Sequence, residues 1–265
     1  MEFIDLINNY MKNDIAISIK NLNKTYSIKG TQKLSIKNHI TTLFNNKKNK
    51  RIKALTNINL EIKKGEIFGI IGKNGSGKST LLNIIMESIV ADSNSEVIST
   101  GKLMRLSLGM GVDPNLSARD NIYVNGSVIG LSFKKIGEIF NDILNFSDLH
   151  GFVDTPVKFY SKGMRQRLLF SIAVHAEADI FLLDEFFGGT GDQEFKAKSE
   201  EAFNKHILEG RTIVIVSHSL KIIRKLCNRS IWLHKGEIRC QGDTKTVIKE
   251  YKDWAKQLIL TNKNK

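Results

Sequence analysis

The chain of 265 residues has little cysteine, and it has neither a long apolar run nor a secretory leader pattern at its start. Its two cysteines, Cys227 and Cys240, show no paired spacing, which argues against a disulfide framework and against a cysteine-based metal site. No stretch approaches the roughly 18 apolar residues that a membrane-spanning helix needs. The first residues lack the basic segment and apolar core of a secretory signal. We therefore expect a protein of the cytoplasm.

Acidic residues are absent from a long stretch near the start of the chain. No Asp or Glu occurs from Ile15 to Leu60, although the same stretch is rich in lysine, and the net charge of the whole chain is +13. One interpretation is a lysine-rich and asparagine-rich surface that is simply solvated. The other is contact with an anionic partner, such as lipid headgroups, a phosphorylated glycan or nucleic acid.

An alternation of short apolar strands with helical patterns organises the rest of the chain. No internal repeat is visible, so we expect one large α/β domain rather than a tandem pair. Such an alternation predicts a mostly parallel sheet with helices on both faces. The predicted strands are 15–19, 54–62, 67–71, 96–99, 103–106, 179–183, 212–216, 231–233 and 237–239. The predicted helices are 78–89, 117–149, a segment ending near 175, 194–208, 220–226 and 246–260, and 1–13 is expected to be a short helix or arm.

A glycine-rich loop, Gly72-Lys73-Asn74-Gly75-Ser76-Gly77-Lys78-Ser79, follows the apolar strand 67–71 and opens a helix. Glycines let backbone N–H groups turn towards phosphate oxygens, and the helix N-terminus favours negative charge. We expect Lys78 to reach the β- and γ-phosphates of a nucleotide, Ser79 to ligate Mg²⁺ and Thr80 to assist at the α-phosphate. The alternative is a structural turn. The predicted nucleotide-binding residues of this segment are Gly72, Asn74, Gly75, Ser76, Gly77, Lys78, Ser79 and Thr80.

Two adjacent carboxylates, Asp184 and Glu185, close a later apolar strand. The segment from Ile180 to Glu185 resembles a Walker B strand. This resemblance implies that a buried strand delivers Asp184 to the magnesium shell and that Glu185 orients and activates the attacking water. Phosphoryl transfer asks mainly for positioning and for charge stabilisation, which carboxylates beside the γ-phosphate can supply. The alternative is a strand that simply ends in two surface acids.

Between the loop and these carboxylates lies the run Tyr160-Ser161-Lys162-Gly163-Met164, at the start of a predicted helix. A glycine loop, then Ser-x-Gly at a helix start, then an apolar strand ending in Asp-Glu, is an order that resembles the ATP-binding cassette (ABC) ATPases. The resemblance implies a P-loop NTPase core with a mostly parallel sheet, an N-terminal antiparallel β subdomain and a helical insert at about 112–165. It further implies a head-to-tail homodimer, with ATP held between Lys78 of one copy and Ser161 and Gly163 of the other.

Two single residues gain a role from the same resemblance. His218 follows the apolar strand 212–216, where a histidine of the family contacts the γ-phosphate and the catalytic glutamate; a satisfied structural histidine is the alternative. Tyr26 comes just after the first predicted strand and resembles the family's adenine-stacking aromatic residue, with ordinary packing as the alternative.

The signature Tyr160-Ser161-x-Gly163-Met164 is similar to that of the ABC subunits that export cell-surface polysaccharides. The run from Gly109 to Leu116 and the pair Gly191-Asp192 also resemble that branch. This resemblance implies a separate membrane permease as partner, a lipid-linked glycan as cargo, and a peripheral position on the cytoplasmic face of the plasma membrane. The rivals are an exporter of another lipid or of a drug, and a soluble ABC protein acting on nucleic acid; a catalytically inactive subunit is disfavoured because the motifs are intact.

A basic insertion at about 27–53 separates Tyr26 from the second predicted strand. Within it, Ile36, Ile40, Leu43 and Phe44 share one face at helical spacing, which predicts a short basic amphipathic helix. Our hypothesis is that this helix meets the permease near the headgroups and the glycan's anionic head. The alternative is a solvated loop packed on its own domain.

The sequence also departs from the family pattern. Ser107-Leu108 stands where most members have a glutamine that touches Mg²⁺ and senses the permease, so no magnesium ligand can be assigned there. The stretch from Glu185 to Asp192 is longer than expected, which leaves the role of Asp192 open. The last predicted helix, 246–260, ends close to Lys265, so we expect no further glycan-binding domain.

Overall fold

A computed structural model of the chain describes residues 14–28, 50–107, 111–185, 193–205 and 210–263. The predicted arm at 1–13, the predicted amphipathic helix within 29–49 and the position of Asp192 lie outside these residues. The same holds for Leu108, for Gly109 and Met110 at the start of the run that ends at Leu116, and for Gly191.

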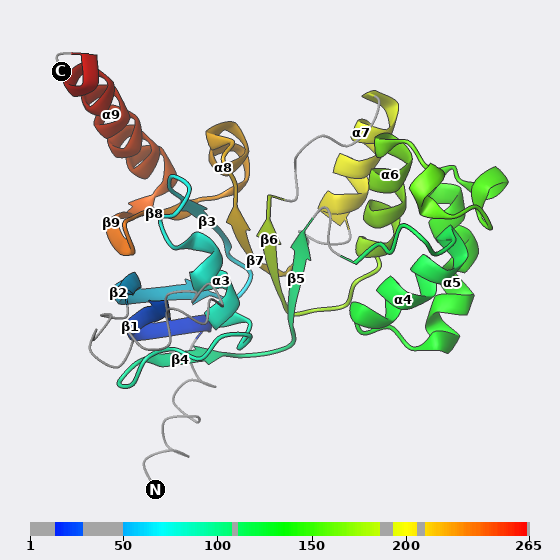
Figure 1. Ribbon diagram of the computed structural model, residues 1–265, viewed down its shortest axis with the longest axis horizontal. Coiled ribbons are helices and arrows are strands. Elements are labelled where there is room, and N and C mark those ends of the chain that lie inside the picture. The colour runs from blue at the N-terminus through cyan, green and yellow to red at the C-terminus, as the bar shows by residue number, and fades with distance from the viewer. Residues whose placement is uncertain (1–13, 29–49, 108–110, 186–192, 206–209, 264–265) are drawn as a thin grey trace, which may run out of the picture.

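A six-stranded sheet forms the centre of the molecule, in the order β5-β6-β7-β3-β8-β9 (Figure 1). All neighbouring pairs are parallel except β8 and β9, which form an antiparallel hairpin. The prediction of a mostly parallel sheet is confirmed. The strands are β3 (Ile67–Ile71), β5 (Leu103–Ser107), β6 (Ile180–Asp184), β7 (Thr212–Val216), β8 (Arg229–His234) and β9 (Glu237–Asp243).

An antiparallel sheet in the order β2-β1-β4 lies beside the central sheet and confirms the predicted β subdomain. Two of its strands are much longer than expected, because β1 continues through a bulged, polar stretch in which Asn21 has a φ of 49°. Tyr26 therefore lies within β1, and its prediction as a residue just after the strand is wrong. Both ends of the predicted insertion, 27–28 and 50–53, are strand as well. The strands are β1 (Ile15–Ile28), β2 (Lys50–Lys63) and β4 (Glu96–Ser99).

Apolar residues on both faces of the central strands divide the core into two parts. On β6, Ile180 and Leu182 pack into one cluster, whereas Phe181 and Leu183 pack into the other. The first cluster also contains the buried face of helix α3 (Lys78–Ile85) and the apolar residues of β1 and β2. Helix α3 is thus enclosed between the two sheets, and this fixes the glycine loop that precedes it.

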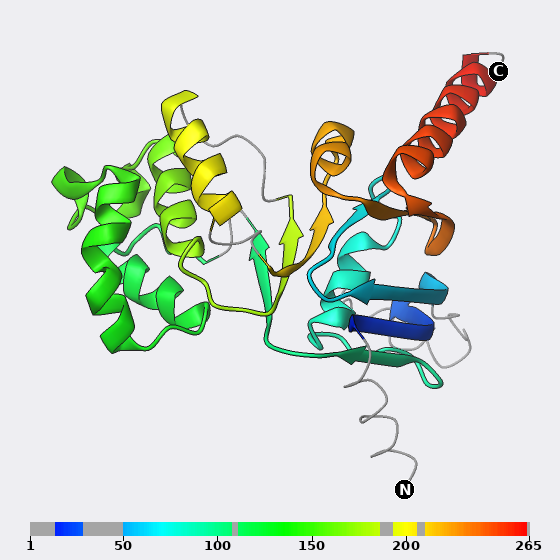
Figure 2. The ribbon, with the colours of Figure 1, turned by 180° about the vertical axis from the view of Figure 1, so that it is seen from behind.

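Helices α4 to α7 form a lobe at the β5 side of the central sheet (Figures 1 and 2). The single helical pattern predicted for 117–149 is two helices, because Gly130 turns the chain with a φ of 84° and Ser132 caps the next helix. Ser117 begins the first of them with a capping box to Asp120. The elements are α4 (Ala118–Val128), α5 (Phe133–Ser147), the 3₁₀ turns η1 (His150–Phe152) and η2 (Val157–Phe159), α6 (Lys162–Ala173) and α7 (Gln193–Phe203).

Two further helices lie at the other side of the sheet. Helix α8 (Leu220–Leu226) has the predicted bounds, and α9 (Thr244–Lys263) is longer than predicted at both ends. The far half of α9 projects from the body of the molecule in both views (Figures 1 and 2). Across the described ranges, no helix combines the length and the apolar character required to cross a membrane.

Candidate nucleotide site

The parallel strands bring the predicted motifs to one edge of the central sheet. The glycine loop follows β3, Asp184 ends β6, and His218 comes just after β7. Because β6, β7 and β3 are adjacent and parallel, their carboxyl ends meet at the same edge. Ligands of open α/β sheets bind at this edge.

The glycine loop is built as an anion cradle. Among the described residues, the backbone N–H groups of Asn74, Gly75 and Gly77 have no acceptor, and the buried hydroxyl of Ser76 has no partner. Helix α3 begins at Gly77 without a side-chain cap and without an acidic residue in its first turn. The free donors and the positive end of the helix therefore point to a phosphate as the missing partner.

Close packing around the loop explains two of its glycines. A Cβ at Gly77 would lie 2.7 Å from the Ala54 carbonyl oxygen, and one at Gly72 would lie 2.3 Å from that of Leu233. Gly75 is different, since a Cβ there would meet nothing within 4 Å, but its φ of 75° still favours glycine.

The Lys78 ammonium is folded back over the loop. Its Nζ donates to the carbonyl oxygens of Gly72 at 2.9 Å and Lys73 at 3.1 Å. Burial lowers the pKa of Lys78, while the negative charges of Glu185 and Asp184 act in the opposite direction. The two carboxylates are thus electrostatically coupled to the lysine, as a site for a phosphate and a cation requires.

Asp184 already has a partner that sequence analysis missed. Arg105 of β5 donates from Nη2 to Asp184 Oδ2 at 2.5 Å, and from Nη1 to Asn83 Oδ1, also at 2.5 Å. The available signal was a charged residue inside the otherwise apolar strand Leu103–Leu106. The second carboxylate oxygen of Asp184 has no bonded partner among the described residues.

Glu185 and His218 are in contact. The backbone N–H of His218 donates to Glu185 Oε1 at 3.0 Å, and His218 Nε2 lies 3.5 Å from the same oxygen. Both side chains are about half exposed. The backbone of Glu185 has a φ of 52°, which is a strained value for a residue with a side chain. Backbone strain of this kind is retained where it sets the direction of a functional side chain. Here it directs the Glu185 carboxylate from the edge of the sheet towards solvent.

Tyr26 is partly buried and pairs with Ile52 across β1 and β2. A little further along, Leu55 of β2 contacts the loop, since its Cδ2 would be 2.8 Å from a Cβ at Gly77. Tyr26 therefore lies on the sheet that borders the loop, with the Lys24 ammonium 5.4 Å from its ring centre. This position is compatible with stacking on a base.

Ser161 and Gly163 lie at the start of α6 in the helical lobe, which is separated from α3 by the central strands (Figure 1). Ser161 caps the helix by accepting from the Met164 N–H at 3.1 Å. A Cβ at Gly163 would have no contact closer than 3.8 Å. The structure does not bring this pair to the glycine loop of its own chain.

A nucleotide and its metal ion fit the residues present. The loop offers unpaired donors, as phosphate oxygens require, and Ser79 and Asp184 offer the hard oxygen ligands that Mg²⁺ prefers. Ser79 is exposed at the start of α3, and the Asp184 side chain is 15% exposed.

An aromatic cluster beside the loop was also missed from the sequence. The Trp254 ring of α9 lies 5.2 Å from that of Trp232, 4.7 Å from that of His234 and 5.9 Å from that of Tyr251, centre to centre. Lys73 of the glycine loop places its ammonium 4.8 Å from the Trp254 ring centre. Helix α9 is thereby connected to the candidate site.

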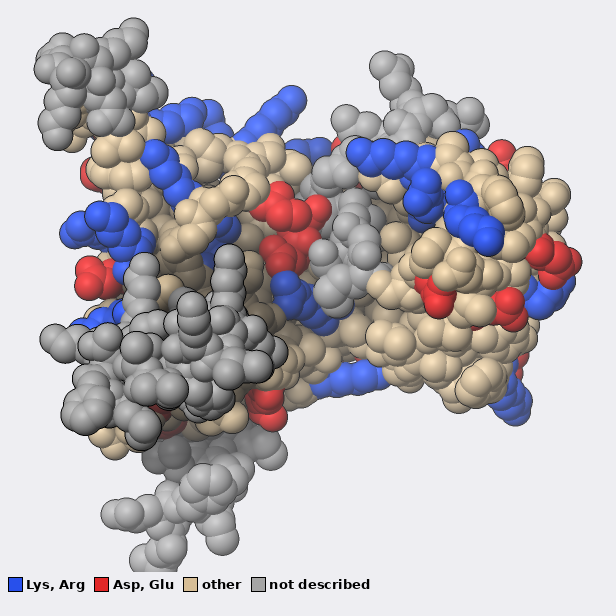
Figure 3. Space-filling view, in the orientation of Figure 1, with Lys and Arg blue, Asp and Glu red and all other residues tan. Residues whose placement is uncertain are grey.

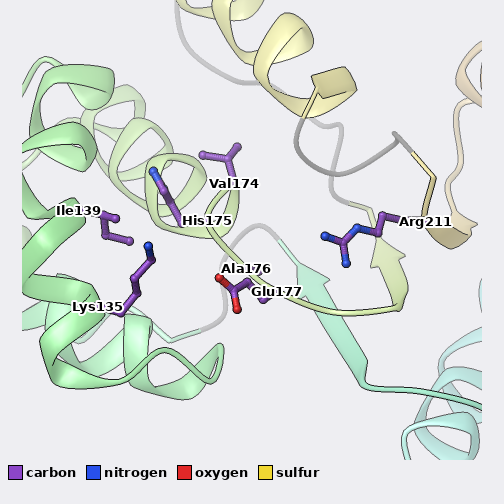
Figure 4. A pocket seen from close by; sticks show the side chains of 7 residues that line it. All are labelled: Lys135, Ile139, Val174, His175, Ala176, Glu177 and Arg211. Carbon is purple, nitrogen blue, oxygen red and sulfur yellow. The ribbon is translucent and has the colours of Figure 1, made fainter.

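A hollow of about 240 Å³ lies at the opposite ends of the strands (Figure 4). Lys135, His175 and Glu177 line it from the helical lobe, and Arg211 faces it from the residue before β7. Arg211 donates to the Ala178 carbonyl oxygen. Because His218 follows the same strand that Arg211 precedes, this hollow is separate from the candidate nucleotide site.

The strand order and the glycine loop between β3 and α3 place the protein in the class of P-loop NTPase folds. The family model described as "ABC transporter" matches residues 55–188, and the chain belongs to that family.

Several teichoic acid export proteins are similar to this chain in sequence. A protein of Enterococcus faecalis named teichoic acids export ATP-binding protein TagH is 40% identical over 91% of this chain, and 53% of that protein is covered. Proteins of the same name from Lactococcus lactis and Listeria innocua are 39% and 36% identical, over 93% of this chain, with 53% and 72% of those proteins covered. The chain thus spans about half the length of the first two.

Among solved structures, a dimeric bacterial ABC transporter cassette has a TM-score of 0.64 at 25% identity, over 86% of this chain and 98% of that one. A dimeric cassette in a post-hydrolysis state, bound to ADP and Pi, has a TM-score of 0.63 at 24% identity, with the same coverage. These likenesses confirm the predicted fold class.

Proposed function

We propose that the chain hydrolyses ATP and thereby energises the export of a cell-surface polysaccharide of the teichoic acid kind. The observation that carries the ATPase part is the convergence of Lys78, Asp184, Glu185 and His218 at the carboxyl edge of the central sheet. The names of the relatives support the choice of cargo.

In this proposal the glycine loop and Lys78 bind the phosphates, and Tyr26 stacks on the base. Glu185 accepts a proton from a water molecule while the oxygen of that water forms a bond to the γ-phosphorus. The bond from the γ-phosphorus to the β,γ-bridging oxygen breaks, and ADP leaves with that oxygen. His218 holds the Glu185 carboxylate and faces the γ-phosphate. Mg²⁺, held by Ser79 and Asp184, supplies charge neutralisation for the phosphate oxygens when it is bound.

A second copy of the chain completes each site. Ser161 and Gly163 are remote from the loop of their own chain, but their hydroxyl and N–H groups lie at a helix N-terminus that can receive a γ-phosphate. A head-to-tail homodimer would bring them to the nucleotide held by the partner copy, and the dimeric state of the two similar solved cassettes supports this arrangement.

The remaining partner in this proposal is a membrane permease that moves the lipid-linked glycan, with the chain bound to its cytoplasmic side. We expect no direct binding to nucleic acid. Where side chains are described, Figure 3 shows lysine and arginine spread over the visible face rather than gathered in one stripe. A basic patch or stripe is the usual footprint of nucleic-acid binding.

The ATPase part is tested by steady-state turnover with the Glu185→Gln variant. We expect its turnover to fall by about 10²-fold or more, because the general base is lost while the phosphate cradle remains. Glu177→Gln is the matched control, since it removes an exposed carboxylate at the opposite ends of the strands and should leave turnover unchanged. Equal activity of Glu185→Gln and the parent would overturn the assignment.

The export part is tested by isolating the tagged chain in mild detergent from its native cells. A stoichiometric multi-span membrane protein in the complex is the expected result. Ribosomal proteins or nucleic acid, with no membrane protein, would favour the soluble alternative instead.

A further inference from the structure

Arg105 lies outside every motif that predicts nucleotide binding, yet it contacts two of the elements that carry them. Its strand, β5, is next to β6 in the sheet, with Arg105 opposite Leu182 and Ser107 opposite Asp184. The side chain extends along β6 to reach Asp184 at the end of that strand. Only 20% of the arginine side chain is exposed.

The same guanidinium also reaches the helix that follows the glycine loop. Its second terminal nitrogen donates to Asn83 of α3, at 2.5 Å, as close as the bond to Asp184. Arg105 therefore connects three elements: β5, the strand that ends in Asp184, and the helix that begins with Lys78. A planar guanidinium holds two acceptors in fixed relative positions, which a flexible ammonium does not.

The charge of Arg105 is as important as its geometry. One oxygen of Asp184 accepts from the guanidinium, and the carboxylate is only 15% exposed, so water screens the pair poorly. A divalent cation that approaches Asp184 therefore meets a fixed positive charge at the same carboxylate. The guanidinium attracts the carboxylate and repels the cation.

We propose that Arg105 is a positioning residue that fixes the carboxylate of Asp184 relative to helix α3 and lowers the affinity of the site for its divalent cation. The inference rests on the proposed role of Asp184 beside a nucleotide. Arg105 acts through Asp184 and does not itself touch the phosphates.

The test is a titration of Mn²⁺, followed by electron paramagnetic resonance, in the presence of ATP. Every variant carries Glu185→Gln so that ATP is not consumed. In Arg105→Gln, the Mn²⁺ concentration at half saturation should fall about 5-fold or more, because the repelling charge is gone. Arg105→Lys, which retains the charge, should stay within about 2-fold of the parent. If Arg105→Gln does not fold, Arg105→Met replaces it, since an apolar side chain suits the buried strand.

Arg119→Met is the matched control. It removes another arginine–aspartate pair, between Arg119 and Asp154 at 2.8 Å, from an exposed place on the helical lobe. Its Mn²⁺ titration should match that of the parent. A merely structural role for Arg105 would change thermal stability without tightening Mn²⁺ binding.

A separate titration with a fluorescent ATP analogue, without a divalent cation, distinguishes the two possible failures. If neither the parent nor the variants bind the analogue, the proposed function fails. If all bind it and Arg105→Gln has unchanged or weaker Mn²⁺ affinity, the role of Arg105 is wrong while the nucleotide site stands.

Discussion

Replacement of single glycines in the phosphate-binding loop should separate backbone strain from steric conflict. Gly75 and Gly77 both have positive φ, 75° and 107°. A Cβ at Gly75 would meet nothing within 4 Å, whereas one at Gly77 would lie 2.7 Å from the carbonyl oxygen of Ala54 and 2.8 Å from Leu55 Cδ2. The backbone oxygen belongs to a strand of the antiparallel sheet and cannot rotate away.

The expected cost follows from these contacts. An alanine with positive φ costs about 1–2 kcal/mol, so Gly75→Ala should lower the free energy of unfolding by about that amount. Gly77→Ala adds a steric conflict worth about 1–3 kcal/mol, for a total of about 2–5 kcal/mol. The difference between the two variants should therefore be about 2 kcal/mol.

Urea denaturation of the nucleotide-free protein, followed by tryptophan fluorescence, measures both values. Nucleotide binding gives the complementary result, because Gly75 is exposed at the cradle: Gly75→Ala should fold and yet bind ATP more weakly. Equal destabilisation by the two substitutions would refute the packing of the loop against the antiparallel sheet.

Three further predictions concern the surroundings of the site. Trp254→Ala should lower the free energy of unfolding by about 2–3 kcal/mol, since it removes a half-buried ring with several aromatic neighbours and the cation–π contact to Lys73. Lys73→Ser loses only that contact and should lower the free energy of unfolding by about 0.5–1 kcal/mol in the same urea denaturation experiment. Burial and nearby cationic side chains lower the pKa of His234. Its contribution to stability is therefore present above the usual histidine pKa of about 6.5 and is lost as the pH falls through the pKa of His234 in the folded protein. His234→Gln should thus flatten the acid side of a plot of melting temperature against pH. Burial raises the pKa of Cys227 to about 12. Iodoacetamide at pH 8 should therefore label Cys240 in the native protein and reach Cys227 only after unfolding, as measured by peptide mass spectrometry. Labelling of Cys227 in the native protein would contradict its burial.

The parts of the fold that sequence periodicity predicted are those in which local pattern and burial agree. The strands at Ile67–Ile71 and Thr212–Val216 are continuous apolar runs, and both are found with the predicted bounds. The central strand of the antiparallel sheet, β1, was predicted too short because Asn21 interrupts its alternation, and pairing with β2 keeps that stretch extended. Pairing between distant strands leaves no local signal, and this is why Tyr26 was placed beyond the strand.

The same limit applies to the candidate site. Lys78 and Asp184 were predicted from motifs that follow or end an apolar strand, and His218 from the resemblance to the family. The parallel topology of the structure brings all three to one edge of the sheet. Arg105 was missed because its partners come from two other elements, and Trp254 because an amphipathic helix does not reveal which strand it packs against. Contacts of this kind depend on tertiary packing, which the spacing of residues does not encode.

The central claim is that each ATP site combines Lys78 of one copy with Ser161 of another, and a mixing experiment tests it most directly. Lys78→Ala and Ser161→Arg should each be inactive alone, because every homodimeric site then carries a defect. In an equal mixture, random pairing gives heterodimers with one intact site, so turnover should recover to about a quarter of the parent's value. A mixture with no more activity than its two components, under conditions in which light scattering shows dimers of both variants, would contradict the shared site.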